Sequence, residues 1–519
     1  MRLTGFALLV STALAGPALA EPFTCPHTGG TLTFGQEANV NSLDQMASNT
    51  ISTRNIAMNV FEALMTRDEN NNPIPDLADS YTESPDRMTY TFKLRPDVTF
   101  HNGKKLTSAD VVASFNRYSK LGLDRQQLEA VQSWDAPDPS TFVIHMKAVQ
   151  PTFIEKLSAF SVPIVIIPSE DEQDPPQQLK IIGTGPFQLA ENVPGSYVTI
   201  KRFADYKPNT HFDGRTGFGG RKQACLDQVT FRIVTEGGAR VAGLETGELQ
   251  AVEDIPTKSV DRLKGNKDIR LLPLNNWWIQ IADLNLSNPP TDNLKVRQAM
   301  QAVLEMDEIM DAATDGNYRL NAGFAYPNQP DYVEPPAGYY NQHDPAKAKR
   351  LLAEAGYKGE PVVLLTNKDY GSMYNAALVV QEQFKSVGIN ADLRVVDWPT
   401  SVQMALRPDT GWNLAFTGWG TQPALGALAT MSFFAPPVAV YMPKDGQGDP
   451  DLLAAWAAMN NSATKEERKA AFGRMQAIIY EKALALPFGA LTKVQATRAN
   501  VQGFVPFRIP RMFNVWLNG

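Results

Sequence analysis

The chain has 519 residues, of which 43% are hydrophobic and 20% charged, and its formal net charge is −7. This composition is typical of a folded globular protein and excludes a disordered chain or a polytopic membrane protein. Lysines and arginines form no long run, which argues against nucleic acid or an anionic membrane as a partner. The length exceeds what one hydrophobic core usually serves, so two or three domains or subdomains are expected.

Residues 1–20 have the three parts of a secretory signal peptide: a basic Arg2, a short apolar stretch and the small-x-small site Ala18-Leu19-Ala20. The alternative is a buried N-terminal helix. The apolar stretch is shorter than the about 20 residues that span a membrane. No cysteine follows the cleavage site directly, so no lipid anchor is expected there. The mature protein is predicted to begin near Glu21 and to be periplasmic.

Cys25 and Cys225 are the only cysteines. Outside the cytoplasm the environment is oxidising, and we expect one disulfide between them. Two free, buried thiols are the alternative. No CxxC pair and no spacing typical of metal ligands is present.

The first half of the mature chain alternates between strand and helix patterns. Thr107 stands three residues before Asp110, as at the start of a capped helix. Residues 183–187, "GTGPF", resemble a phosphate loop but lead into a strand, so a structural turn is expected. Apolar periodicity predicts strands over 29–38, 88–94, 140–147, 162–168, 197–203, 226–234 and 275–286, and helices over 53–68, 106–118 and 237–249.

The second half continues the mixture. One helix has its boundaries written in the sequence: Asp344 as cap, Pro345 in the first turn and Gly356 past the end. Long linkers and repeats are missing, so the domains must join through short crossings, which suit a hinge. The pattern predicts helices over 293–313, 343–357, 373–388 and 464–483, and strands over 361–367, 390–398, 412–416, 484–491 and 501–507.

Motifs of catalysis are missing from the sequence: there is no GxSxG, HExxH or Walker-type loop. No two histidines are four residues apart, so a zinc or iron site is not expected, and no cofactor is predicted. Connecting segments are instead rich in aromatic residues with polar neighbours, a composition typical of ligand clefts. These aromatic residues are Trp277, Trp278, Tyr370, Tyr374, Trp398, Trp412 and Trp419. Trp412, ahead of a strand, is expected to lie in the core.

Four segments in this order resemble the extracytoplasmic solute-binding proteins of the peptide/nickel class (family 5), the receptors of dipeptide and oligopeptide ABC transporters. The resemblance covers nearly the whole mature chain. The four segments are 59–117, 183–187, 288–309 and 340–357.

The resemblance implies an α/β fold of the periplasmic-binding-protein type (class II-like), with two lobes, an extra subdomain in lobe I and a hinge of two crossing strands. The crossings are expected near 274–280 and 485–491. The implied domains are a lobe I core of 21–65, 186–274 and 491–519, an extra subdomain of 66–185, and lobe II of 275–490.

The resemblance also implies a function. A ligand that contacts both lobes favours their closed arrangement, which delivers the ligand to the ABC permease in the inner membrane. The protein is then a receptor of an importer, not an enzyme, and is expected to be a monomer with a small-molecule ligand.

Ligand-contacting segments of the family map onto four places here. They lie before the first helix, at the first crossing, after the strand at 361–367, and around Trp419. The candidate ligand-binding residues are Asn49, Thr50, Ser52, Arg54, Trp277, Trp278, Tyr370, Ser372, Trp398, Trp419, Thr421 and Gln422.

One departure from the family pattern concerns the ligand. Peptide-binding members usually carry an aspartate just after the matching tryptophan, where it pairs with the ligand's α-ammonium group. Here Trp419 is followed by "GTQPA", and no acid lies between Asp409 and Asp445. Since a buried ammonium without a charge partner costs several kcal/mol, we predict a ligand other than an ordinary free-amine peptide. A peptide-like, opine-like or glycoside-like solute is expected, with Arg54 meeting a carboxylate or forming a surface or interlobe salt bridge.

Two alternatives remain open on the sequence. A peptide receptor would need its acid from elsewhere, for instance Asp369 or Asp397. A secreted hydrolase on a two-lobed scaffold would need a nucleophile and a base, and no such pattern is present. Nickel chelates and haem are the least expected ligands, because the sequence contains few histidines.

Overall fold

The computed structural model describes residues 21–518 apart from 71, 177, 276–277, 328, 330–331, 421–425, 436–438, 444–445 and 463. The predicted signal peptide lies outside these residues. Within them, no helix has both the length and the apolar character that a membrane crossing requires.

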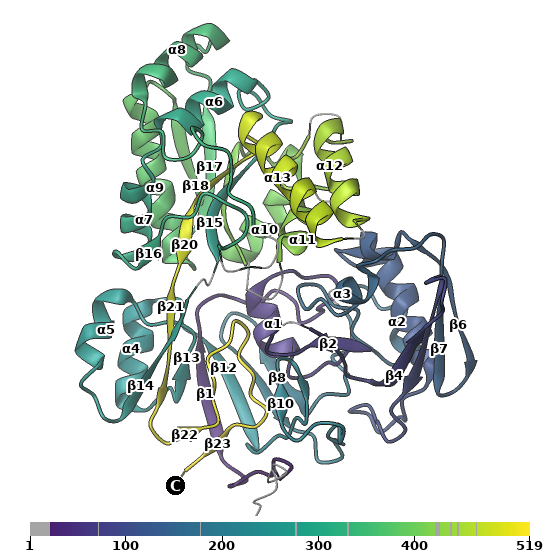
Figure 1. The fold of residues 1–519 in the computed structure, drawn as a ribbon. Helices are drawn as coiled ribbons and strands as arrows, with labels where there is room; N and C mark the ends of the chain where they lie inside the picture. Colours follow the sequence, from purple (N-terminus) through teal and green to yellow (C-terminus); the bar gives the residue numbers. More distant parts are fainter. Residues whose placement is uncertain are drawn as a thin grey trace, which may run out of the picture.

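The chain forms two α/β lobes, which lie one above the other in Figure 1. Lobe I is built on a mixed seven-stranded sheet, with α1 (Ile51–Ala57), α4 (Gly237–Thr246) and α5 (Thr257–Leu263). Its strands, in spatial order, are β14 (Ile269–Leu274), β21 (Lys493–Arg498), β13 (Ala251–Val252), β1 (Thr31–Gln36), β12 (Gln228–Ile233), β9 (Tyr197–Arg202) and β8 (Phe187–Val193).

Lobe II is built on a mixed six-stranded sheet. Its strands, in spatial order, are β16 (Tyr318–Arg319), β20 (Ala485–Leu491), β15 (Ile279–Leu284), β19 (Leu414–Trp419), β17 (Val362–Asn367) and β18 (Ala391–Val396). Its helices are α6 (Leu294–Val303), α7 (Met306–Thr314), α8 (Pro345–Ala355), α9 (Gly371–Ser386), α10 (Trp398–Ala405), α11 (Gly426–Met431), α12 (Pro450–Asn460) and α13 (Lys465–Glu481).

A smaller antiparallel sheet lies beside lobe I (Figure 1). It contains β4 (Ala78–Glu83), β5 (Thr89–Leu94), β7 (Thr141–Met146) and β6 (Val131–Asp138), with α2 (Ser108–Leu121) and α3 (Phe153–Leu157) next to it. We call this part the extra subdomain. Short two-stranded ladders complete the fold: β2 (Met65–Arg67) with β3 (Pro73–Pro75), β10 (Arg215–Thr216) with β11 (Gly219–Gly220), and β22 (Val501–Gln502) with β23 (Trp516–Leu517).

The chain passes between the two large sheets twice. It leaves lobe I after Leu274 and enters β15 at Ile279, and it returns between Leu491 and Lys493. Figure 1 shows β20 and β21 as one nearly continuous path from the upper lobe to the lower one. The prediction of two lobes with two crossing strands is therefore confirmed. The residue boundaries of the domains stay a prediction, although Leu491 pairs in the lobe II sheet, one residue beyond the predicted limit.

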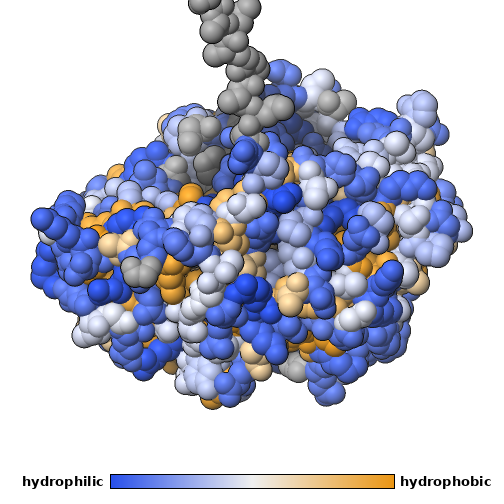
Figure 2. All heavy atoms as spheres, turned by 90° about the horizontal axis from the view of Figure 1, so that it is seen from below, coloured by the Kyte–Doolittle hydropathy of each residue, from blue (hydrophilic) through white to orange (hydrophobic). Residues whose placement is uncertain are grey.

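Apolar side chains fill separate cores in the two lobes. The central strand β15 is buried along its whole length, because helices cover both faces of its sheet. Ala282 and Leu284 pack with α6, α7 and α9, whereas Ile281 packs on the other side with α12 and α13. Residues facing outward in the view from below are mostly hydrophilic, with hydrophobic ones in separate patches (Figure 2).

The strongest local signals of the sequence, its helix caps, are present in the structure. Thr107 and Asp110 form a capping box on α2, and Asp344 caps α8, which has Pro345 in its first turn and Gly356 in the left-handed conformation after its end. Trp412 is fully buried, as predicted.

Four element predictions are wrong in type or length. Residues 162–168 form no strand, although their apolar side chains are buried. The helix predicted over 53–68 is only α1, and the chain then turns into β2. The helix predicted over 293–313 is broken by extended backbone at Leu304, giving α6 and α7. Only β22 forms within 501–507. Each segment is apolar enough to be buried, and its tertiary surroundings decide its conformation.

The predicted disulfide is present: Cys25 and Cys225 are bonded, with an S–S distance of 2.00 Å and a Cα–Cα distance of 5.5 Å. It ties the N-terminal segment to the residues just before β12. A polar contact supports the same junction, because the backbone N–H of Gly29 donates to the carbonyl oxygen of Cys225 at 2.8 Å.

The "GTGPF" segment is a structural turn, held by His101. The N–H of Gly183 donates to Nδ1 of His101 at 3.1 Å, and Nε2 donates to the carbonyl oxygen of Gly185 at 3.0 Å. A Cβ atom at Gly183 would lie 2.1 Å from the carbonyl oxygen of Val60. The glycine is therefore required by close backbone approach, and Nδ1 must be unprotonated to accept its hydrogen bond.

We expect the neutral His101 to make stability depend on pH. Burial lowers the pKa of His101 from its ordinary value of 6.5 to about 4. The unfolded chain therefore binds the proton first, so this contribution is present above pH 6.5 and is lost as the pH falls from 6.5 toward 4. The loss should be on the order of 2 kcal/mol, allowing for partial exposure of the ring.

Thermal midpoints measured over this pH range test the expectation. The variant His101→Gln should show a shallower pH dependence than the wild type. The control His27→Gln, at an exposed side chain of the N-terminal segment, should keep the wild-type slope. Identical slopes for wild type and His101→Gln would contradict the expectation.

Candidate functional site

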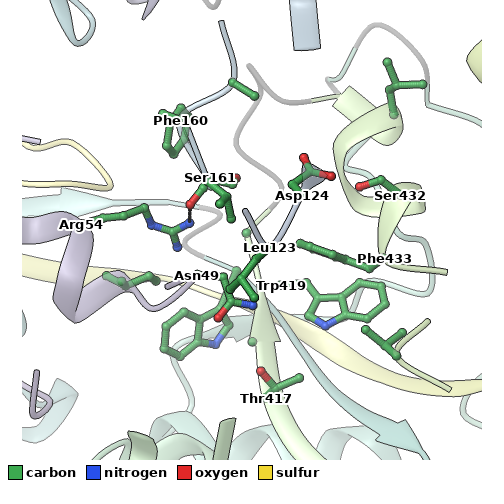
Figure 3. Close-up of a pocket in the computed structure, with 18 of the residues that line it drawn as sticks. Asn49, Arg54, Leu123, Asp124, Phe160, Ser161, Thr417, Trp419, Ser432 and Phe433 are labelled. Carbon is green, nitrogen blue, oxygen red and sulfur yellow. Dashed lines mark hydrogen bonds between the residues drawn. The ribbon is translucent and has the colours of Figure 1, made fainter. Parts of the chain in front are cut away.

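A cavity of about 580 Å³ lies between the lobes. Lobe I and the extra subdomain contribute Asn49, Arg54, Asp124 and Phe160, and lobe II contributes strand residues of β15 and β19. Figure 3 shows Arg54 and Ser161 on one side of the pocket, Trp419 and Phe433 on the other, and Asn49 between them. Both charged and aromatic side chains line this cavity, as in typical small-molecule sites.

The candidate residues named from the sequence fall into three groups. Thr50 and Ser52 do not line the cavity: Thr50 caps α1 through Thr53, and the Ser52 hydroxyl donates to Thr50. Ser372, in the first turn of α9, does not line it either. Trp277, Thr421 and Gln422 lie outside the described residues. The cavity is lined by Asn49, Arg54, Trp278, Tyr370, Trp398 and Trp419.

Three of these aromatic rings form a column at the lobe II side of the hinge. Tyr370 packs edge-to-face on Trp278 at 5.3 Å and on Trp398 at 5.2 Å between centroids. The ammonium of Lys493, at the second crossing, lies 5.0 Å from the centre of the Trp278 ring. Trp278 is 1% exposed, and a Cβ atom at Gly418 would lie 2.5 Å from its indole. Trp278 and Tyr370 are thus wall residues packed too closely to be stacking platforms open to solvent, whereas Trp398 is half-buried.

Trp419 belongs to a second aromatic cluster on the other face of the lobe II sheet. Its ring packs against Phe433 at 5.3 Å and Phe434 at 5.2 Å, and near Phe324 at 5.9 Å. It is 4% exposed, so little of its surface meets the cavity. Its indole is used within the protein, because it hydrogen-bonds to the carboxyl of Asp283.

Two buried arginines face the cavity, Arg54 from α1 and Arg508 from the segment after β22. Burial, followed by the charge of Arg508, lowers the pKa of Arg54 to about 9. Burial also lowers the pKa of Arg508 to about 10. Burial therefore disfavours the charged form of each guanidinium relative to water. A nearby anion would stabilise that charged form.

The environment of Arg54 contains little that offsets its charge. One terminal nitrogen donates to the carbonyl oxygen of Ser161 at 2.9 Å, and Nε has no hydrogen-bond partner among the described residues. Within the described residues no acidic side chain pairs with Arg54. The interlobe salt bridge considered from the sequence is therefore not found there.

The lack of a side chain at Gly420 leaves the space that the Arg508 guanidinium occupies. A Cβ atom at Gly420 would lie only 1.1 Å from a guanidinium nitrogen of Arg508. Arg508 follows the return to lobe I, whereas Gly420 follows β19 of lobe II. The glycine thus leaves room for a cation of one lobe against the backbone of the other.

Sequence reasoning missed two acids of the cavity, Asp283 and Asp124. Asp283 lies on β15 and is 7% exposed, and its Oδ1 has no hydrogen-bond partner among the described residues. Burial raises its pKa well above the ordinary value, opposed by hydrogen bonding from the Trp419 indole. Burial also raises the pKa of Asp124 to about 6, against the attraction of Lys156. Neither acid belongs to a local motif, so only the fold brings them to the cavity.

The acids considered from the sequence are used elsewhere. Asp369 accepts a hydrogen bond from the backbone N–H of Trp398 at 3.2 Å, and Asp397 caps α10 by accepting from the N–H of Thr400 at 2.8 Å. Neither lines the cavity. Among the described residues, the buried acid near Trp419 is instead Asp283.

Contacts between the extra subdomain and α12 close one margin of the cavity. Lys156 donates through Nζ to Oδ1 of Asn460, and the hydroxyl of Thr152 donates to the Asn460 carbonyl oxygen at 3.4 Å. The Lys156 ammonium also lies 5.8 Å from the centre of the Trp456 ring. The two lobes thus touch on the side opposite the hinge strands, which encloses the cavity.

The site offers binding groups more than catalytic ones. In the part of the chain that the structure describes, no group of three or more His, Cys, Asp or Glu side chains is arranged to hold a metal ion. Aromatic walls, two guanidinium groups and a buried carboxyl suit the capture of a polar solute.

Comparison with known proteins gives matches over most of the chain. The family described as bacterial extracellular solute-binding proteins, family 5 Middle, matches residues 72–437. The probable peptide ABC transporter periplasmic-binding protein y4tO of Sinorhizobium fredii is 26% identical over 98% of this chain and 97% of its own. The glutathione-binding protein GsiB of Salmonella typhi is 27% identical over 96% of this chain and 94% of its own.

A solved structure has the same fold. The periplasmic binding protein AgaA of A. tumefaciens R10, determined in complex with agropinic acid, superposes with a TM-score of 0.82. The match covers 94% of this chain and 99% of AgaA, at 24% sequence identity.

Proposed function

Because the chain belongs to the bacterial extracellular solute-binding proteins of family 5, we propose that the interlobe cavity holds a carboxylate-bearing solute between Arg54 and Arg508. The protein is a substrate-binding receptor of an ABC importer, and such receptors close their lobes around a solute. The observation that carries the ligand class is the pair of buried guanidinium groups at one cavity, of which Arg54 has no acidic partner in the described part of the chain.

The physical reason is the unfavourable charge of the two cations. Each has a lowered pKa, and the charge of Arg508 adds to the effect of burial on Arg54. A ligand carboxylate offsets both charges and accepts charge-assisted hydrogen bonds from them. Glutathione and agropinic acid, named for two relatives, are both carboxylic acids. They support a ligand of this class without identifying it.

We further propose that the ligand lacks the free ammonium group of an ordinary peptide. No acid lies between Asp409 and Asp445, and the guanidinium groups of Arg54 and Arg508 repel a cation. An opine-like solute, a sugar-containing acid or a modified peptide has the required chemistry. A peptide receptor is the second candidate, and the observation that favours it is the buried Asp283 in the same cavity.

The remaining parts of the proposal concern the cell. The protein is exported by the signal peptide at 1–20, acts in the periplasm as a monomer and delivers its ligand to the membrane permease without chemical change. The family is one of binding proteins, and the missing motifs of catalysis support the absence of turnover. Incubation of the purified protein with its ligand should return the ligand intact.

Native mass spectrometry of protein purified from the periplasm tests the proposed ligand class. We expect a co-purified carboxylic acid without a free amine. Calorimetry compares agropinic acid with two acids that carry a free ammonium group, glutathione and the dipeptide Met-Leu. Tight binding of Met-Leu or glutathione, together with weak binding of agropinic acid, would establish the peptide receptor instead.

The variant Gly420→Ala should weaken ligand binding without unfolding the protein. Its methyl group takes the place of the Arg508 guanidinium, which is the end of a flexible side chain and can move. We expect the affinity for the co-purified acid to fall about tenfold, as for one lost charge-assisted hydrogen bond. The control Gly371→Ala has no atom within 4 Å of its new methyl group and should bind normally. An unchanged affinity in Gly420→Ala would remove Arg508 from the site.

A further inference from the structure

The cavity has a second polar region, on the lobe II sheet away from Arg54. It is formed by Asp283 on β15 and by Thr417 and Trp419 on β19. In the antiparallel pair, Ile281 lies opposite Thr417 and Asp283 opposite Ala415. Directly opposed side chains share a face, and so do residues two apart on one strand. Asp283, Thr417 and Trp419 therefore project from the same face of the sheet.

Polar atoms of this region have no hydrogen-bond partner among the described residues. Oδ1 of Asp283 is buried and has no hydrogen-bond partner among the described residues. The half-buried hydroxyl of Thr417 lines the cavity, and no hydrogen bond to it is found in the same part of the chain. The walls around them are apolar and include Ala415, Phe433 and Met442. A buried polar group without a partner costs free energy that a ligand can recover.

We propose that Asp283, Thr417 and Trp419 form a subsite for an uncharged, hydroxyl-bearing group of the ligand. The donor and acceptor types carry this choice. The indole N–H of Trp419 donates to the Asp283 carboxyl and so orients it, whereas the Thr417 hydroxyl and a protonated Asp283 both donate and accept. A ligand hydroxyl group can accept from the Thr417 hydroxyl and donate to Oδ1 of Asp283 at once.

An ammonium group suits the same place less well. It has donors only, so it cannot accept a hydrogen bond from the Thr417 hydroxyl or from a protonated Asp283. It would also enter a cavity that already holds the two guanidinium charges of Arg54 and Arg508. Among the described residues no cation contributes to the environment of Asp283, which is apolar apart from the Trp419 indole. A neutral carboxyl is the form of Asp283 that this environment favours.

This inference rests on the proposed function, because it places the hydroxyl-bearing end of a ligand whose carboxylate lies at Arg54. The two ends of the ligand are thereby specified by different residues. Arg54 and Arg508 bind the carboxylate of the ligand. Asp283, Thr417 and Trp419 form the subsite for its hydroxyl-bearing group.

Three six-carbon probes test the subsite: D-gluconate, hexanoate and 6-aminohexanoate. All have a carboxylate, and they differ in carrying hydroxyl groups, no polar group or an ammonium group. By calorimetry or ligand-observed NMR we expect gluconate to bind about tenfold more tightly than hexanoate, as for one or two net hydrogen bonds. We expect 6-aminohexanoate to bind most weakly of the three.

Conservative variants separate the possible roles of Asp283. Thr417→Val and Asp283→Leu should each remove most of the advantage of gluconate over hexanoate. Asp283→Asn, which keeps a neutral donor and acceptor, should bind gluconate within about threefold of the wild type. The control Thr82→Val, on the exposed part of β4, should change nothing.

The outcomes distinguish the subsite from the carboxylate site. If 6-aminohexanoate binds best and Asp283→Asn loses that preference, Asp283 pairs with an ammonium group and the inference is overturned. Equal affinities for gluconate and hexanoate would also overturn it. If none of the probes binds, or if Arg54→Met leaves hexanoate binding unchanged, the proposed carboxylate site fails, and the subsite loses its premise.

Discussion

Replacing Arg54 with methionine should lower the affinity for the carboxylate-bearing ligand by about 100-fold, which corresponds to about 2.7 kcal/mol of binding free energy. Methionine keeps much of the apolar volume and removes the charge. Arg54 has a lowered pKa from burial and from Arg508, so its charge is costly until an anion arrives. The variant should therefore lose ligand binding and keep or raise its thermal midpoint.

This combination of effects separates a binding role from a structural one. A structural arginine would lose stability and affinity together when it is replaced. Arg350→Met, on the exposed face of α8, is the matched control and should leave both quantities unchanged. Calorimetry with the co-purified acid and thermal unfolding without it provide the two measurements. An Arg54→Met variant that binds the acid normally would refute the proposed anchor.

Removing the disulfide should produce the largest change in stability. The bond closes a loop of 200 residues, and its loss in the double variant Cys25→Ala/Cys225→Ala should destabilise lobe I by about 5 kcal/mol in the chain-entropy model. The thermal midpoint of lobe I should then fall by about 10 °C. Ligand affinity at low temperature should be unchanged, because neither cysteine lines the cavity.

A reducing agent provides the control for this expectation. It should lower the midpoint of the wild type toward that of the double variant and leave the double variant unaffected. If the reduced wild type keeps its midpoint, the bond contributes little, and the hydrogen bonds around Gly29 hold the N-terminal segment by themselves.

Much of the fold could be predicted from the sequence because its signals are local. Asp344, Pro345 and Gly356 specify both ends of α8 within one stretch of chain. Tertiary packing decided the exceptions. Residues 162–168 are as apolar as a strand and are buried, yet their pairing with a neighbour stops at one isolated bridge, between Val165 and Ala63. The break at Leu304 likewise has no Pro or Gly to mark it.

The site was only partly predictable. Arg54 and Trp278 were found because the segments around them resemble ligand-contacting segments of the family. Arg508 and Asp283 belong to no such segment, and a lone arginine or aspartate in a sequence is usually a surface residue. Asp283 could have been suspected from one signal: it interrupts the apolar run of β15, a strand that is buried on both faces. A charged residue in such a strand requires a partner or a function.

Both ends of the described chain belong to lobe I. The N-terminal segment leads into β1, and the C-terminal residues form β23 with β22, on the same side of the molecule (Figure 1). Lobe II is inserted between the two crossings and has no free end. A surface tether or fluorescent fusion attached at either terminus would therefore be attached to lobe I. Lobe II would remain free to move relative to lobe I when the ligand binds. Immobilised sensors built from this protein should keep their full response to the ligand.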